Sequence, residues 1–72
     1  MTKINEIPLL DGLTLARAVK ACGLAETGGQ AKLVIREGMV LMNGSVETRP
    51  GTQLAAGDTI SMEGHPAWRV TG

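Results

Sequence analysis

The stretch TGGQAKLVIREGMVLMNG, residues 27–44, changes its hydrophobic period halfway along, and this change decides the expected fold. Its first half predicts a helix, because turning each residue by about 100° brings three apolar side chains to one side: Ala31, Val34 and Ile35. Thr27-x-x-Gln30 has the spacing of a capping box, in which the hydroxyl and the amide each satisfy a backbone N–H. Gly38 ends this helix, and from Met39 onward the period becomes two, as in a strand.

A shorter helix is predicted upstream, over residues 14–22. Its apolar residues recur at helical spacing on one face, and they are Leu15, Ala18, Val19 and Cys22. Gly23 follows as a left-handed stop, after which Leu24 can fold back on Val19. Neither helix is long enough to be stable alone, so we expect both to pack on each other or on a sheet.

Short alternating segments follow the helices and predict a small sheet. Val40–Met42 and Ser45–Thr48 flank Asn43-Gly44, the dipeptide typical of a two-residue hairpin turn. Further extended segments are expected at Thr59–Met62, at Ala67–Val70 and, before the helices, at Ile4–Ile7, which Pro8 ends. The fold class is therefore α+β, with two packed α-helices followed by a small antiparallel or mixed β-sheet.

At 72 residues, the chain has room for one domain, residues 1–72, and not for a deep catalytic pocket with its own supporting shell. The single cysteine excludes an internal disulfide, and one histidine is too few for a zinc-ligand set. Apolar runs such as Val40–Met42 are too short for a membrane span and no signal peptide is recognisable, so we expect a cytoplasmic protein without a membrane partner. The net charge is zero at pH 7, but residues 12–38 hold four basic residues against two acidic ones.

The cations and glycines of the two helices form the candidate binding surface. Gly29, Lys32 and Arg36 lie on the side of the second helix roughly opposite its apolar face. A helix start offers unpaired N–H groups and a partial positive charge, and a glycine without a side chain lets a phosphate approach. Arg17 and Lys20 face outward on the first helix, so four cations share one surface if the helices pack side by side. The alternative interpretation is that the glycines allow a close helix–helix crossing and the cations form a solvated face.

No set of residues in the sequence points to catalysis. Gly28-Gly29-Gln30 matches the tripeptide of peptide-release factors, but three residues recur by chance and here they open a helix. A phosphate-binding loop is excluded because residues 28–32 lack its spacing and its following hydroxyl. Trp68 alternates along a strand and is expected in the core, His65 is expected in a turn, and Cys22 is expected as a small buried hydrophobe. We therefore expect no enzyme, no cofactor, no metal site and no small-molecule substrate.

Residues 23–60, GLAETGGQAKLVIREGMVLMNGSVETRPGTQLAAGDTI, carry a resemblance to a known family. Its motif consists, in order, of Gly23, Ala31-Lys32, Gly38, Val40, Asn43-Gly44 and Gly57-Asp58. With these residues the chain resembles the S-four RNA-binding domain, named for protein four of the small ribosomal subunit. It is most similar to the small stand-alone bacterial proteins of that family, and the resemblance covers residues 15–62.

The resemblance implies two packed helices followed by a small sheet, the αL motif, and binding of structured RNA, commonly ribosomal or transfer RNA, without a cofactor. Lys32 stands where the family carries a helix-two cation, Arg17 where a helix-one lysine is common, and Thr48-Arg49 matches the E-T-R stretch of the small members. The candidate RNA-binding residues are Arg17, Lys20, Gly28, Gly29, Gln30, Lys32, Arg36, Thr48 and Arg49. Two departures lower the expected number of phosphate contacts: Gly28 replaces a frequent arginine, and residues 50–53 lack the usual cations.

The favoured function is thus a non-catalytic, ribosome-associated RNA-binding module that acts as a monomer. Two alternatives of another class stay open: a protein-interaction adaptor that uses an edge of the sheet, and a β-grasp-like carrier. The carriers share the Asn-Gly hairpin and the late Gly-Asp turn, but they activate a C-terminal Gly-Gly, whereas this chain ends Val70-Thr71-Gly72.

Overall fold

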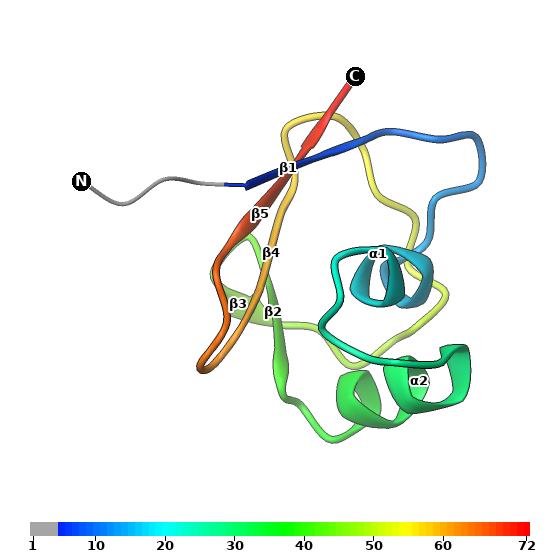
Figure 1. The fold of residues 1–72 in the computed structure, drawn as a ribbon, viewed down its shortest axis with the longest axis vertical. Helices are drawn as coiled ribbons and strands as arrows, with labels where there is room; N and C mark the ends of the chain where they lie inside the picture. Colours follow the sequence, from blue (N-terminus) through cyan, green and yellow to red (C-terminus); the bar gives the residue numbers. More distant parts are fainter. Residues whose placement is uncertain (1–4) are drawn as a thin grey trace.

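A computed structural model describes residues 5–72 as two helices packed on one face of a sheet. The elements are, in order, β1 (Asn5–Pro8), α1 (Leu15–Ala21), α2 (Gly28–Arg36), β2 (Val40–Met42), β3 (Ser45–Val46), β4 (Thr59–Met62) and β5 (Trp68–Thr71). Figure 1 shows the sheet on one side of the molecule and both helices on the other. The predicted α+β class is confirmed. Within residues 5–72, no helix combines the length and the apolar character that crossing a bilayer requires.

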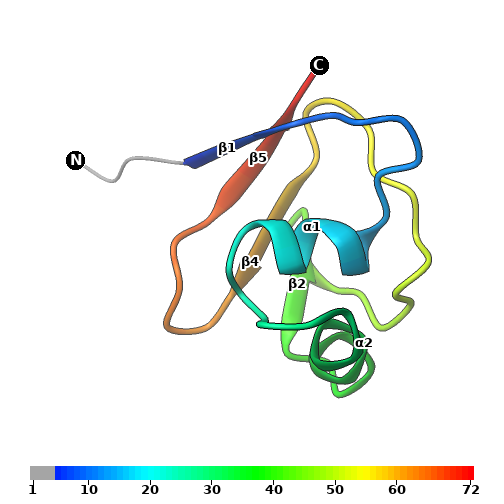
Figure 2. The ribbon, with the colours of Figure 1, turned by 45° about the vertical axis from the view of Figure 1, so that its right-hand side comes forward.

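The sheet has five strands in the order β1-β5-β4-β2-β3 and is mixed. β1 runs parallel to β5, with Ile7 opposite Val70, whereas the other neighbouring strands are antiparallel. Figure 2 shows β1 and β5, from the two ends of the chain, lying along each other. The extended segment predicted before the helices joins this sheet as an edge strand, beside the strands that follow the helices. Pro8 was expected to follow the strand, but it is the last residue within it. Ile4, the predicted first residue, lies outside the described residues.

Both helices begin and end as their sequences predict. Thr14 and Thr27 are the N-caps, and the hydroxyl of Thr27 accepts from the backbone N–H of Gln30 over 3.0 Å. Each helix is followed by a glycine with a left-handed φ, Gly23 after α1 and Gly38 after α2. The backbone N–H groups of this glycine and of the next residue donate to carbonyls in the last turn of the helix. The Gln30 amide also satisfies a backbone N–H, as predicted, because its oxygen accepts from Glu26 N–H over 2.8 Å.

The hairpin between β2 and β3 is held by side chains as well as by its turn. Asn43 and Gly44 have φ of 54° and 83°, the positive values that a two-residue hairpin turn requires. The Asn43 amide donates to Asp58 over 3.0 Å and accepts from the backbone N–H of Thr59 over 2.9 Å. This links the hairpin to the turn before β4. β3 is shorter than predicted, and β5 begins and ends one residue later than predicted.

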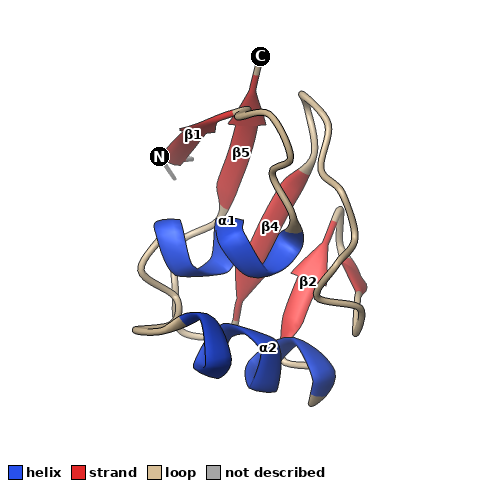
Figure 3. Ribbon diagram, turned by 90° about the vertical axis from the view of Figure 1, so that its right-hand side faces the viewer, coloured by secondary structure: helices blue, strands red, loops and turns tan. Residues whose placement is uncertain are grey.

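The core lies between the helices and the sheet (Figure 3). Its largest fully buried side chains are Leu15, Ile35, Ile60, Val19, Val40 and Val70. Cys22 packs against this core and is partly buried. Trp68, predicted as a core residue, instead lies half-buried at the margin of the core. Its strand has only β1 beyond it on that side of the sheet, so the large indole is covered incompletely.

Candidate nucleic-acid interface

The first turn of α2 exposes backbone without side chains. Gly28 and Gly29 do not have left-handed φ values, so the backbone conformation does not require glycine there. A Cβ at Gly28 would meet nothing within 4 Å, and one at Gly29 would meet only the hydroxyl of Thr27 at 4.0 Å. The interpretation that these glycines permit a close helix–helix crossing is therefore wrong. The bare N–H groups of this turn are suited to an anion, because they carry the positive end of the helix dipole.

Lys32 and Arg36 continue this surface along α2. Both are exposed and lie one turn apart, while Ala31 and Ile35 on the other side of the helix are fully buried. Their placement follows from the helical period read in the sequence. Among residues 5–72, the only ion pair joins Arg49 to Glu47, so neither α2 cation is neutralised by a carboxylate of the described chain.

Arg17 and Lys20 occupy the exposed side of α1, opposite the buried Leu15 and Val19. α1 and α2 pack against each other and cover the same face of the sheet (Figure 3). The two cation pairs therefore lie on neighbouring helices. Arg17 and Lys20 also line a groove between α1 and β1, which the two α2 cations do not reach.

Thr48 and Arg49 lie in the loop that follows β3, and later residues of this loop contact the start of α1. The backbone N–H groups of Leu15 and Ala16 donate to the carbonyls of Thr52 and Pro50, over 2.8 and 3.1 Å, and this docks the loop on the helix start. Thr48 is exposed, whereas its neighbour Arg49 forms an ion pair with the carboxylate of Glu47. The Arg49 guanidinium lies 3.3 Å from Glu47, and its backbone N–H donates to the same carboxylate over 3.0 Å. Among residues 5–72, Arg49 is thus the one candidate cation whose charge is paired with a carboxylate.

The backbone N–H of Arg49, followed by its guanidinium, holds the pKa of the Glu47 carboxyl below its ordinary value of 4.5. Because folding lowers this pKa, the interaction favours the folded state at pH values above that of the unfolded carboxyl. That contribution is lost as the pH falls through the lower folded value. At neutral pH, Glu47 is ionised and remains on Arg49.

The Gln30 amide oxygen and the Cys22 thiol are not available for binding or catalysis. The amide oxygen of Gln30 is used at the helix start, where it accepts from Glu26 N–H. Burial raises the pKa of the Cys22 thiol to about 11, which keeps it protonated at neutral pH and unsuited to nucleophilic attack. No group of three or more His, Cys, Asp or Glu side chains suited to hold a metal ion occurs in the described part of the chain.

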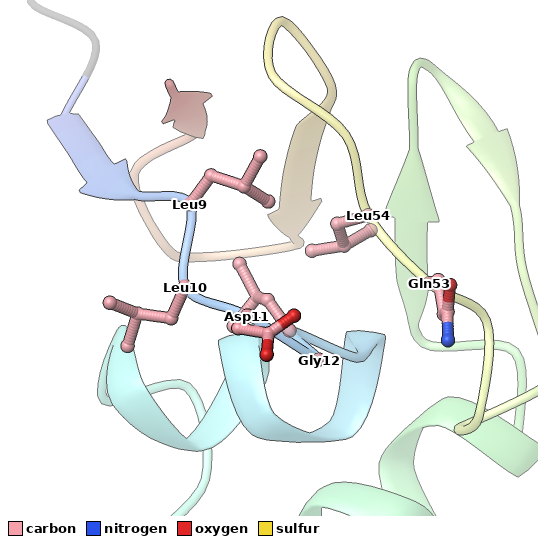
Figure 4. A pocket seen from close by; sticks show the side chains of 7 residues that line it. Leu9, Leu10, Asp11, Gly12, Gln53 and Leu54 are labelled. Atoms are coloured by element: carbon pink, nitrogen blue, oxygen red, sulfur yellow. The ribbon is translucent and has the colours of Figure 1, made fainter.

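Two hollows flank the turn at residues 9–13. The smaller, of about 370 Å³, is shown in Figure 4, where Leu9 and Leu54 point toward each other and Asp11 and Gln53 supply the polar groups. It contains a carboxylate and no cation, so it does not suit a phosphate. The larger hollow is the groove beside Arg17, lined also by Trp68. Sequence reasoning missed it because its walls come from both ends of the chain.

Comparison with known proteins agrees with this geometry. The S4 domain matches residues 10–70. This chain belongs to the S4 domain family. The match includes both helices and all candidate RNA-binding residues, and it leaves the β-grasp carrier alternative without support.

Two bacterial proteins are similar to this S4 domain in sequence. "Putative RNA-binding protein YbcJ" of Escherichia coli is 45% identical over 51 residues, which are 71% of this chain and 73% of YbcJ. "Probable ribosome maturation protein RlbA" of Bacillus subtilis is 33% identical over 58 residues, which are 81% of this chain and 82% of RlbA. The resemblance stated from the motif is thereby confirmed.

The S4 domain is also similar to a solved structure. The solution structure of E. coli YbcJ, described as revealing an αL motif involved in RNA-binding, superposes with a TM-score of 0.71 at 35% identity. The alignment covers 100% of this chain and 92% of that protein, so the likeness includes the strands at both ends. The predicted αL architecture is confirmed.

Proposed function

We propose that this protein is a non-catalytic RNA-binding module that holds structured RNA against the exposed sides of α1 and α2. The observation that carries the proposal is that this helix pair, within an S4 domain, presents four exposed cations without ion-pair partners among residues 5–72. They are Arg17, Lys20, Lys32 and Arg36. The descriptions of YbcJ and RlbA support the same class of function.

The first turn of α2 and the four cations have complementary roles toward phosphates. The N–H groups at Gly28 and Gly29 bind a phosphate oxygen at short range, because no side chain stands in front of them. Lys32 and Arg36 neutralise the next phosphates, and Arg17 and Lys20 extend the contact to α1. Such contacts supply affinity and orientation but do not read the base sequence.

A folded RNA suits this surface better than a single strand. Proteins that bind single strands stack successive bases on several aromatic rings, whereas this chain has one aromatic residue, Trp68. Helical RNA is recognised mainly by the placement of its phosphates and 2′-hydroxyls, which needs no aromatic platform. We propose ribosomal RNA, with transfer RNA as the second choice, and a monomeric protein in the cytoplasm.

The test compares the affinities of the wild type and of Lys32→Ala and Arg36→Ala for a ribosomal RNA fragment, for transfer RNA and for an unstructured oligonucleotide. Each substitution removes a phosphate contact and should cost about 1 kcal/mol, with a salt slope shallower by about one. Arg69→Ala is the matched control, because Arg69 is exposed on β5 and alternates with the buried Val70. It therefore points away from the helices.

Filter binding at several salt concentrations gives both affinity and slope. The proposal expects tighter binding to the folded RNAs than to the oligonucleotide, and a loss confined to the helix variants. Equal losses in Arg69→Ala and the helix variants would place the contact elsewhere or make it a general effect of charge. Wild-type affinities that do not change with salt would contradict a phosphate-binding surface.

A further inference from the structure

A groove of about 590 Å³ lies between α1 and the paired strands β1 and β5. Most of its lining is apolar, and comes from Ile7, Pro8, Leu10, Leu13, Ala21 and Trp68. Leu10 is 61% exposed although it is a large hydrophobic residue. This volume falls in the range of small-molecule sites, and such sites are commonly apolar with a few polar groups at defined positions.

Trp68 is held in this groove by packing alone. Its indole Nε1–H is buried and, among residues 5–72, is the one buried side-chain polar atom without a hydrogen-bond partner. A buried donor without an acceptor is costly, so a small turn of the ring toward an acceptor from a ligand would be favourable. The ring is half-buried and presents its remaining surface at the groove.

The cations of the groove lie on its α1 wall, where Arg17 and Lys20 are one turn apart. Glu6 on β1 is the one carboxylate among the lining residues, but it lies opposite Arg69 in the sheet and alternates with the buried Ile7, so its side chain points away from the helices. Neither cation forms an ion pair with a described carboxylate. A ligand that fits has an anion at the α1 side and a flat apolar body.

We propose that this groove accepts a single unpaired nucleotide that projects from the bound RNA. The base lies against Leu10 and Trp68, and its phosphate meets Arg17 and Lys20. This rests on the proposed RNA-binding function, since the same two cations serve both surfaces. An acidic apolar peptide also carries anions, but the two cations of the groove belong to the proposed RNA-binding surface, and this continuity favours a nucleotide.

The experiment uses the full chain and two RNA hairpins that are identical except for one unpaired nucleotide in the stem. Trp68 is the only tryptophan and the chain has no tyrosine or phenylalanine, so its fluorescence reports on this groove alone. The hairpin with the unpaired nucleotide should bind about tenfold more tightly, the effect expected of one base stacked on an aromatic ring. It should also quench Trp68, whereas the fully paired hairpin should not.

A pair of matched variants tests whether the preference for the unpaired nucleotide and the quenching of Trp68 arise in the groove. Leu10→Glu adds a negative charge to the lining, and Val46→Glu adds the same charge at a residue of similar exposure, 61% against 57%, on β3 at the other edge of the sheet. Leu10→Glu should abolish the preference for the unpaired nucleotide and the quenching. Val46→Glu should keep both.

Three results would overturn the proposal. Equal affinities of wild type for the two hairpins would refute the nucleotide site, while salt-dependent binding of both hairpins would leave the helix surface intact. No binding to either hairpin would instead contradict the proposed function itself. Quenching by an acidic apolar peptide, but by neither hairpin, would assign the groove to a protein partner.

Discussion

Glu47 lies two residues before Arg49, and its carboxylate accepts from both the backbone N–H and the guanidinium of that arginine. The first of these bonds is local and holds the turn, whereas the second neutralises a candidate phosphate ligand. Arg49 is highly exposed, so the ion pair is weak enough to exchange for a phosphate. We therefore expect Glu47 to weaken the proposed contact of Arg49 with RNA in the free protein.

Glu47→Gln should strengthen RNA binding, because it removes a negative charge and releases the Arg49 guanidinium. We expect a gain of about twofold to fivefold and a steeper salt dependence, measured by the same filter-binding titration. Glu63→Gln is the control, since Glu63 is an exposed carboxylate in the turn after β4. An equal gain in both variants would indicate only a change in net charge, and an unchanged affinity in Glu47→Gln would remove Arg49 from the interface.

The first turn of α2 contains two residues that do not favour helix stability, Gly28 and Gly29. Glycine is a poor helix former, yet neither packing nor φ requires it at the first two positions of this helix. Replacing Gly28 or Gly29 by alanine should therefore stabilise the protein by about 0.4–1 kcal/mol, mainly by restricting the unfolded chain. The same substitutions place a methyl group where a phosphate is proposed to approach, so RNA affinity should fall.

The opposite signs of these two effects make the glycine test decisive. Thermal or urea unfolding gives the stability, and titration with the ribosomal RNA fragment gives the affinity. Gly51→Ala serves as the control, since a Cβ there also meets nothing within 4 Å and its φ is not left-handed. If Gly28→Ala and Gly29→Ala bind RNA as well as Gly51→Ala does, the bare backbone has no role in binding.

Within the β2–β3 hairpin, the motif residues that carried the family resemblance stabilise the fold. Asn43 and Asp58 bind each other, and Asn43 also accepts from Thr59 N–H. Asn43→Ala should cost about 1–2 kcal/mol of unfolding free energy, because it removes these bonds and places alanine at a positive φ.

Urea denaturation measures the cost of Asn43→Ala, with Ser45→Ala in the same hairpin as the control. The RNA affinity of the folded Asn43→Ala protein should equal that of wild type. A large loss of affinity without a loss of stability would mean that Asn43 contacts RNA directly.

For the molecule as a whole, the pairing of β1 with β5 joins the two ends of the described chain in one sheet. Ile7 on β1 is 6% exposed and lies opposite the buried Val70. Ile7→Ala should lower the unfolding free energy by about 2–4 kcal/mol, a large part of the roughly 5–15 kcal/mol typical of a domain.

The effect of Ile7→Ala is measured by urea denaturation followed through Trp68 fluorescence, with the exposed Leu10→Ala as the control. Trp68 lies on the strand that pairs with β1, so its emission should change together with the global unfolding signal. A stability within about 0.5 kcal/mol of wild type would mean that β1 contributes little to the fold.

Most of the elements were predictable because their signals are local. The cap Thr27, the stops Gly23 and Gly38, and the Asn43-Gly44 turn all lie where the sequence placed them. The exposed sides of both helices were predicted for the same reason, since residues three and four apart on a helix share a face.

Local sequence patterns were sufficient to predict the class of fold, the family motif and the exposed positions of the helix cations. Each of these depends on residues close together in the chain, where spacing alone decides which side chains share a face or a turn. Three features became apparent only in the folded molecule: β1 joins β5, Trp68 lies at the margin of the core, and a groove forms beside Arg17. These features bring together residues from both ends of the chain, and such pairing depends on the shape of the packed core rather than on any local pattern.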